Sequence, residues 1–330
     1  MNSKKRFRKT ISAIIAYSVC SISMIMLNKL IMNTYKLNFP NSLLLLQNSG
    51  ALLLIMLAKS AKFIDCPNLN RSVSMQWIIP TIAFVGMLFS SMRSLELMSV
   101  SAQTVIKNLA IILTATGDYW LYNKRLNTGI FFSFGLLIAG SYLCAKGDPW
   151  VTPWGLFWTF VNIISTVCYM LNVKMLSDRV GKQIGRYGPT LYSNLFSLPF
   201  LLIMGHNEFR EFLNALGDAS WEVMILLALM IFVSAHMAFT VFFCMEMTSP
   251  TTFSVVGTLN KVPIAILGIL VFRQYPDLIG YVGIAVALTG GFMYTFFNIK
   301  SRRGGNDKTP IIERGDDNMI PPEKEPKCLV

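Results

Sequence analysis

The sequence predicts an all-α membrane protein with ten transmembrane helices, arranged as two inverted five-helix repeats. Of its 330 residues, 53% are hydrophobic and only 14% are charged, and so few charges do not cover the surface of a soluble domain of this length. Apolar stretches of about twenty residues, enough to span a bilayer, recur from Ile11 to Ile299. Three glycines also recur after a constant interval of 151 residues.

Each expected span is one apolar run bounded by polar or charged residues. The first run follows the basic segment 4–9 and has no small-residue cleavage site behind it, so we expect it to stay as the first helix and not to be removed as a signal peptide. The polar residues 300–330 are expected to form a disordered tail. The expected spans are 11–32, 40–59, 76–97, 100–122, 127–146, 151–173, 187–205, 220–244, 251–273 and 277–299.

The glycine pattern predicts the repeat. The matched pairs are Gly117 with Gly268, Gly129 with Gly280, and Gly140 with Gly291. Because five is an odd number, two five-helix units must have opposite orientations in the membrane. We therefore expect a basic cytosolic amino terminus (1–10), a first repeat (11–147), a second repeat (151–299) and a cytosolic tail (300–330). Inverted repeats are typical of secondary transporters, which bind substrate near the midplane between the repeats.

The positions of the basic residues predict the orientation. Of the 29 Lys and Arg residues, 21 fall in the even-numbered loops and the two tails, and six lie in or beside the odd-numbered loops. Cytosolic loops carry the excess of Lys and Arg, so we expect both termini in the cytosol. The net charge of +12 is then explained by orientation and does not indicate a nucleic-acid partner.

No cofactor, metal site or enzyme motif is predicted. The six cysteines are scattered without a Cys-x-x-Cys spacing, and only two histidines accompany them, which argues against a zinc site or a disulfide framework. No glycine-rich phosphate-binding loop is visible. We therefore expect transport to be driven by a gradient or by exchange.

Two lysines lie inside the expected spans. Lys107 and Lys261 lie about 10 Å and about 15 Å from the near ends of their helices, and an asparagine neighbours each of them (Asn108 and Asn260). A charge at a helix centre costs roughly 2.5 to 3.5 kcal/mol on insertion scales and is usually kept for function. We interpret the lysines as two cations that face a central cavity and neutralise a phosphate. The alternatives are snorkelling to an interface or pairing with an acid.

The seventh span combines aromatic, hydroxyl and amide groups with two prolines. Pro189 and Pro199 flank Tyr192, Ser193 and Asn194, and prolines within a span favour a kinked helix that lines a cavity. An aromatic ring beside a hydroxyl and an amide can stack on a nucleobase and bind its edge. Packing between helices is the alternative interpretation of the same residues.

The ninth span resembles a known signature. Residues 251–263, Thr-Thr-Phe-Ser-Val-Val-Gly-Thr-Leu-Asn-Lys-Val-Pro, are similar to the Gly-Ala-Leu-Asn-Lys segment of the Golgi GDP-mannose transporters. These belong to the nucleotide-sugar branch of the drug/metabolite transporter superfamily. Thr258 replaces the alanine of the signature. The similarity extends to residues 107–109 and 117–118 in the fourth span, 16–17 and 28–29 in the first and 191–195 in the seventh.

The resemblance implies import of GDP-mannose into the Golgi lumen in exchange for GMP. It implies a multi-pass Golgi protein surrounded by membrane lipid, with the endoplasmic reticulum or transport vesicles as further locations, and it leaves a homodimer open. Phosphate and sugar would be held by the fourth and ninth spans, and guanine would be read by the seventh. The implied substrate-binding residues are Tyr17, Lys107, Asn108, Tyr192, Ser193, Asn194, Phe253, Gly257, Asn260 and Lys261.

Two positions depart from the family pattern. Ser193 stands where the family has a second amide, and Phe253 stands where a tyrosine is typical. A pocket with fewer hydrogen-bonding groups discriminates less well between analogues. Two other hypotheses therefore stay open, a transporter of another nucleotide-sugar or phosphorylated metabolite, and a transport-inactive membrane scaffold of the same fold.

Overall fold

A computed structural model describes residues 3–63, 69–122, 127–184, 188–247 and 250–304. Within these ranges all regular structure is helical, which confirms the predicted all-α class. The elements are α1 (Ser3–Lys29), η1 (Leu30–Thr34), α2 (Pro40–Ser60), α3 (Arg71–Leu97), α4 (Val100–Ile106), η2 (Lys107–Leu109), α5 (Ala110–Tyr122), α6 (Thr128–Gly147), α7 (Pro153–Ile184), α8 (Gly188–Gly217), α9 (Trp221–Met247), α10 (Pro250–Leu259), α11 (Lys261–Phe272) and α12 (Leu278–Gly304).

Eight helices in these ranges are long and apolar enough to cross a membrane. Two of the expected spans are not among them. The fourth is divided into α4, η2 and α5, and the seventh, α8, has its hydropathy lowered by the polar Tyr192-Ser193-Asn194 segment. The fold is therefore that of a multi-span all-α membrane protein, and the count of ten spans stays a prediction.

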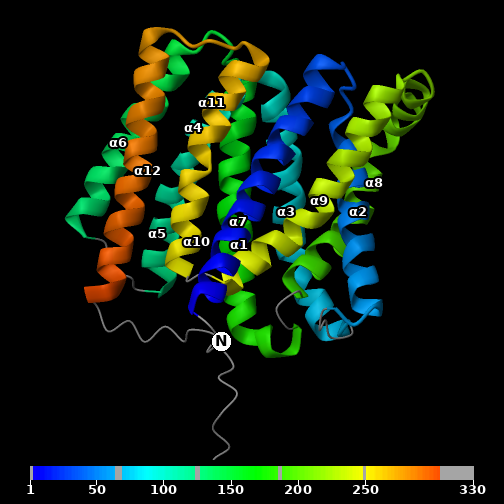
Figure 1. Cartoon of the computed structure of the whole chain (residues 1–330), viewed down its shortest axis with the longest axis horizontal. Helices are drawn as coiled ribbons and strands as arrows, with labels where there is room; N and C mark the ends of the chain where they lie inside the picture. The colour runs from blue at the N-terminus through cyan, green and yellow to red at the C-terminus, as the bar shows by residue number, and fades with distance from the viewer. Residues whose placement is uncertain (1–2, 64–68, 123–126, 185–187, 248–249, 305–330) are drawn as a thin grey trace, which may run out of the picture.

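The helices form one bundle in which neighbours in space are often distant in sequence. Figure 1 shows α6 and α12 side by side at one edge and α2 and α8 toward the other, and α1 begins at the end of the bundle where α12 ends. Along the bundle α3 packs against α7, α1 against α9, and α2 against α8. Both termini of the helical region thus lie at one end of the bundle.

Glycines bring the backbones of α6 and α12 into direct contact. A Cβ atom added to Gly140 would lie 2.3 Å from the backbone nitrogen of Ala287, and one added to Gly147 would lie 2.1 Å from that of Gly280. Small residues permit such close approach, and the dispersion forces between closely packed helices stabilise it within a membrane. Gly140 and Gly280, which belong to two different matched pairs, therefore lie in one helix–helix interface.

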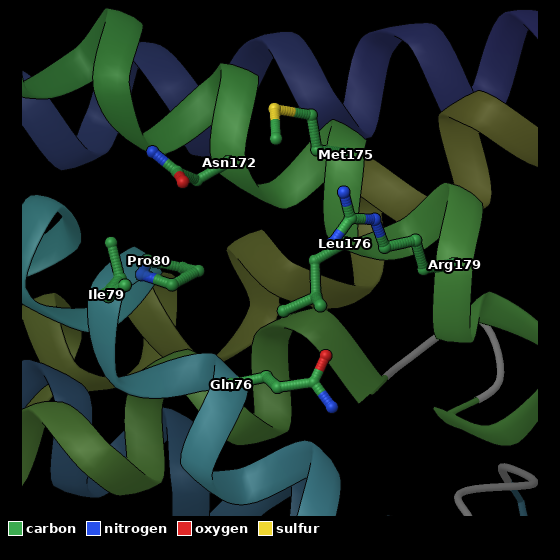
Figure 2. Close-up of a pocket in the computed structure, with 7 residues that line it drawn as sticks. All are labelled: Gln76, Ile79, Pro80, Asn172, Met175, Leu176 and Arg179. Atoms are coloured by element: carbon green, nitrogen blue, oxygen red, sulfur yellow. The ribbon is translucent and has the colours of Figure 1, made fainter.

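Polar side chains join α3 to α7. The amide of Asn162 donates to the backbone oxygen of Met87 at 2.6 Å, and the hydroxyls of Ser94 and Thr159 lie 2.5 Å apart. Near the start of α3 the two helices separate and leave a groove, whose seven lining residues are drawn in Figure 2.

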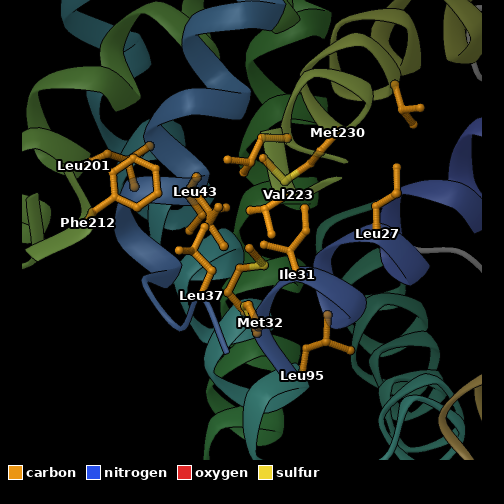
Figure 3. Close-up of a cluster of buried hydrophobic side chains, with 14 of the residues drawn as sticks. Leu27, Ile31, Met32, Leu37, Leu43, Leu95, Leu201, Phe212, Val223 and Met230 are labelled. Atoms are coloured by element: carbon orange, nitrogen blue, oxygen red, sulfur yellow. The ribbon is translucent and has the colours of Figure 1, made fainter. Parts of the chain in front are cut away.

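The largest hydrophobic cluster joins α1, η1, α2, α3, α8 and α9, and it also includes Val100 of α4 and Ile264 of α11. Figure 3 shows side chains from these elements converging, with Leu27, Ile31, Leu43, Leu95 and Met230 among them. Lipid tails are as apolar as these side chains, so transfer from water does not drive the helices together once they are inserted. Close packing and dispersion contacts hold this part of the bundle instead.

Lys29 is one of the six basic residues expected in or beside the odd-numbered loops, and the structure buries it. Its side chain is 1% exposed, and its ammonium group donates to the backbone oxygens of Leu95 at 2.5 Å and Met98 at 2.8 Å. These carbonyls lie at the carboxyl end of α3, where helix geometry provides no backbone donor. Lys29 therefore fastens the end of α1 to the end of α3.

The loop between α6 and α7 reinforces this end of the bundle. One carboxylate oxygen of Asp148 accepts a hydrogen bond from the hydroxyl of Ser99 at 2.5 Å, and the other accepts one from the backbone nitrogen of Trp150 at 2.9 Å. Burial raises the pKa of the Asp148 carboxyl, against these two hydrogen bonds, which lower it. The first turn of α4 is thereby tied to the α6–α7 loop.

We expect Lys29→Met to destabilise the protein by about 1 to 3 kcal/mol, because the carbonyls of Leu95 and Met98 lose their buried donor. Thermal unfolding in detergent measures the effect. Lys36→Met is the matched control, since Lys36 is exposed just beyond η1. Equal melting temperatures for the two variants would contradict the assignment.

Candidate functional site

One cavity lies among α1, α3, α4, η2, α10 and α11. Its volume is about 260 Å³. It is lined by Tyr17, Ser21, Ile25, Asn28, Ser91, Met92, Leu95, Gln103, Thr104, Lys107, Gly257, Asn260, Lys261 and Ile264. Of the ten residues predicted to bind substrate, Tyr17, Lys107, Gly257, Asn260 and Lys261 line it.

Both predicted lysines stand where a helix is interrupted. Lys107 begins the 3₁₀ turn η2, which separates α4 from α5, and Lys261 begins α11, which Asn260 separates from α10. Pro263 contributes to the second break because it has no N–H to donate to the carbonyl of Leu259. Broken helices are tolerated at membrane depth where they line a cavity or are buried in protein.

Lys107 is held by the wall formed by α3. Its ammonium group donates to the hydroxyl of Ser91 at 2.7 Å, and the side chain of Gln103 donates to the backbone oxygen of Ser91 at 2.8 Å. Gln103 lies one turn before Lys107, so both reach Ser91 from the same helix face. The uncharged hydroxyl of Ser91 thus occupies a position at the ammonium group of Lys107 that an anion could take.

Lys261 reaches across the cavity to the other interrupted helix. Its ammonium group donates to the side-chain oxygen of Asn108, which is 1% exposed. Asn260 is 6% exposed, and its side-chain nitrogen has no hydrogen-bond partner in the part of the chain that the structure describes. Asn108 and Lys261 therefore connect η2 with α11, and the Asn260 amide is available to a ligand.

The cavity has a cationic wall without a matching carboxylate. None of the described residues that line it is acidic. Asp118, an acid near the middle of the fourth expected span, forms an ion pair with Lys174 of α7 at 2.7 Å. Among the described residues, the two lysines therefore do not pair with acids in this cavity. An anionic ligand would neutralise them.

Tyr17 is the aromatic residue of the cavity lining, and Phe253, which does not line the cavity, packs against its ring. Their ring centroids lie 5.1 Å apart, a distance typical of favourable aromatic pairs. A Cβ atom added to Gly257 would lie 3.9 Å from the hydroxyl oxygen of Tyr17. The absence of a side chain at Gly257 keeps the backbone of α10 open toward this ring.

The predicted base-reading residues lie elsewhere, in the contact between α8 and α3. Tyr192, Ser193 and Asn194 are all buried. The Tyr192 hydroxyl accepts from the backbone nitrogen of Asn70 at 2.9 Å, and the Ser193 hydroxyl accepts from the indole nitrogen of Trp77 at 3.1 Å. None of the three lines the cavity of the lysines, and their role in reading a base stays a prediction.

Sequence reasoning missed several polar residues of the cavity. Ser91, Gln103, Thr104 and Asn28 all line it. Gln103 could have been found, because it lies four residues before Lys107 and hence on the same helix face. Ser91 lies on a separate helix, and its contact with Lys107 depends on how α3 and α4 pack.

A multi-span helical protein whose two interrupted helices bring lysines to one cavity has the architecture of a secondary transporter. Residues 9–295 match the Triose-phosphate Transporter family, so this chain belongs to that family. It is therefore a transporter and not an enzyme.

Several relatives are similar over most of the chain. GDP-mannose transporter GONST2 of Arabidopsis thaliana is 29% identical over 84% of this chain and 76% of its own. GDP-mannose transporter GONST1 of the same plant is 29% identical over 85% of this chain and 86% of its own. A GDP-mannose transporter of Aspergillus clavatus is 28% identical over 91% of this chain and 82% of its own.

Proposed function

We propose that this protein is a nucleotide-sugar transporter that carries GDP-mannose into the Golgi lumen in exchange for GMP. The similarity to plant and fungal proteins named GDP-mannose transporter supports the substrate. The Golgi location and the exchange for GMP follow from the resemblance of the ninth span to the Golgi GDP-mannose transporters.

The observation that carries the proposal is that Lys107 and Lys261 line one cavity, and that none of the described residues lining this cavity is acidic. GDP-mannose and GMP both present phosphate groups, and ammonium groups bind phosphate through charge-assisted hydrogen bonds. Ser91 and Asn108 accept hydrogen bonds from the two ammonium groups, and phosphate oxygens would take their place. The amide of Asn260 would donate to the same ligand.

The size of the cavity indicates how much of the substrate it receives. Pockets for drug-sized ligands span about 300 to 1,000 Å³, and this cavity measures about 260 Å³. We infer that it accepts the phosphate and sugar portion, and that the base needs space outside it. Ser193 is hydrogen-bonded to both Trp77 of α3 and Tyr169 of α7, so both contacts would have to open before Ser193 could bind a base.

A transporter of another nucleotide-sugar is the second candidate. Ser193 accepts a hydrogen bond from Trp77, and Phe253, which packs against Tyr17 behind the cavity lining, has no hydroxyl. Both features reduce the hydrogen bonds available for reading the base and the sugar. The cationic cavity is common to both candidates, which differ only in specificity.

We further propose ten spans in two inverted repeats, residues 11–147 and 151–299, with both termini in the cytosol. The packing of the helices supports the repeat. In the proposed repeat, α1, α2, α3 and α6 correspond to α7, α8, α9 and α12. The pair α1–α9 then corresponds to the pair α7–α3, and the pair α2–α9 to the pair α8–α3. All four pairs are in contact. The pairs α2–α8 and α6–α12 map onto themselves, as expected for elements on a pseudo-two-fold axis.

We expect GMP to stabilise the purified full-length protein against heat, and UMP and CMP to have little effect. A ligand at 100 times its dissociation constant stabilises by about 2.7 kcal/mol, which is readily measured as a shift in melting temperature. The Lys261→Ala variant is the control and should lose the shift.

The outcomes separate the hypotheses. Stabilisation by UMP without GMP would refute GDP-mannose and favour the second candidate. Stabilisation by free sugar phosphates alone would indicate another phosphorylated metabolite. No response to any of these ligands would favour a transport-inactive scaffold.

A further inference from the structure

A second cavity of about 210 Å³ lies between α3 and α7 and belongs to a different region from the lysine cavity. Figure 2 shows its seven lining side chains around one opening between the two helices. They are Gln76, Ile79 and Pro80 of α3 and Asn172, Met175, Leu176 and Arg179 of α7. The two cavities share no lining residue, so the proposed transport function does not account for this groove.

The groove lies at the boundary between membrane and water. The sixth expected span ends at residue 173, and charged residues follow it in the sequence. Arg179 lies six residues beyond that end, about 9 Å further along the helix. On the facing helix, Gln76 is five residues from Arg71, the first residue of α3. This is the end of the bundle at which α1 begins, and it is the cytosolic end in the proposed orientation.

The groove opens onto the lipid-facing side of both helices. On α3, Met75, Ile79 and Ile82 are 67%, 65% and 54% exposed and lie on one face, whereas Trp77 on the opposite side is fully buried. On α7, Ile164 is 57% exposed and Cys168 is also exposed. Exposed apolar side chains thus follow the groove toward the middle of the membrane on α3 (Ile79, Ile82) and on α7 (Cys168, Ile164), and we call them the apolar track.

The groove offers a cation together with hydrogen-bond acceptors. The guanidinium of Arg179 presents several donors suited to phosphate. The side-chain nitrogens of Asn172 and Gln76 donate to backbone oxygens of their own helices. Pro80 has no N–H, so the helix provides no donor for the backbone oxygen of Gln76. A headgroup with a phosphate and a hydrogen-bond donor matches this combination.

We propose that this groove binds an anionic phospholipid, with its phosphate at Arg179 and an acyl chain along the track of Ile79 and Ile82. The apolar track distinguishes a lipid from a soluble phosphate, which would use the headgroup site alone. Lys182 and Arg186 follow Arg179 in the sequence and add to the positive charge of this segment, which favours a negatively charged leaflet. The assignment does not depend on which solute is transported.

Native mass spectrometry of the delipidated full-length protein tests this site. Phosphatidylserine is titrated against phosphatidylcholine with the same acyl chains, because phosphatidylcholine is uncharged overall and its headgroup has no hydrogen-bond donor. We expect preferential retention of phosphatidylserine, and we expect Arg179→Ala to reduce it about tenfold, the loss typical of one charge-assisted hydrogen bond. Arg179→Lys keeps the charge and should lose less.

Arg71→Ala is the matched control, since Arg71 is exposed on the first turn of α3 and does not line the groove. Equal loss in the Arg71 and Arg179 variants would overturn the site in favour of general surface charge. Equally strong competition by glycerophosphoserine, which has no acyl chains, would overturn the lipid assignment in favour of a soluble phosphate. Thermal unfolding of each variant confirms that a changed lipid count does not arise from loss of folding.

Discussion

Lys261→Ala is expected to reduce uptake of GDP-mannose into proteoliposomes by about 10- to 150-fold at low substrate concentration. Hydrogen bonds to charged groups contribute about 1.5 to 3 kcal/mol, and 1.4 kcal/mol corresponds to a factor of ten. Lys261 lines the cavity and bonds only to the uncharged Asn108 in the described structure, so its removal takes away one of two phosphate partners without leaving a buried acid unpaired.

Two comparisons make the Lys261 experiment decisive. Lys146→Ala removes an exposed lysine at the carboxyl end of α6 and should leave uptake unchanged, which controls for net charge. Without ligand, the melting temperature of the Lys261 variant should fall at most a few degrees below that of the unmodified protein. Uptake at the unmodified rate by well-folded Lys261→Ala protein would refute a role in substrate binding.

Gly140→Leu is expected to prevent correct folding. The first carbon of the new side chain would lie 2.3 Å from the backbone nitrogen of Ala287 and 2.7 Å from its Cα. Backbone atoms cannot rotate away as side chains do, so α6 and α12 must separate along their contact. Overpacking of this kind costs about 1 to 3 kcal/mol and occasionally more, and the backbone contact places Gly140 at the high end of that range.

Gly135 provides the matched control on the same helix. A Cβ atom added there would meet nothing within 4 Å, so Gly135→Leu should fold normally. The measurement is the fraction of monodisperse protein after detergent extraction, followed by thermal unfolding. Equal yield and equal melting temperature for the two leucine variants would contradict the tight contact between α6 and α12.

Much of the site could be predicted because charges inside apolar spans are rare. The cost of such charges marks Lys107 and Lys261 as functional candidates, and both line the cavity. The sequence also predicts Asn108 as a site residue, but it does not indicate that Asn108 binds Lys261 or that Ser91 binds Lys107. Serine is common in membrane helices, and nothing in the spacing of Ser91 distinguishes it from other serines of α3.

The placement of the predicted base-reading segment illustrates a second limit. The sequence indicates that Tyr192, Ser193 and Asn194 share a kinked helix with a role in a cavity. Whether these side chains face substrate or a neighbouring helix depends on the rotation of α8 about its axis, which the sequence pattern does not define. In the structure Trp77 of α3 holds Ser193, and this contact must change if the segment reads a base.

The amino-acid sequence alone was sufficient to predict the membrane class, the helical fold and the family, because these depend on the length and spacing of apolar runs and on local motifs. Packing was needed to decide that Lys261 meets Asn108, that Lys29 is buried against the end of α3, and that glycines of α6 and α12 face one another. Each of these contacts joins residues more than 60 positions apart in the chain. Their positions follow from the directions in which whole helices cross and turn, and local sequence does not encode those directions.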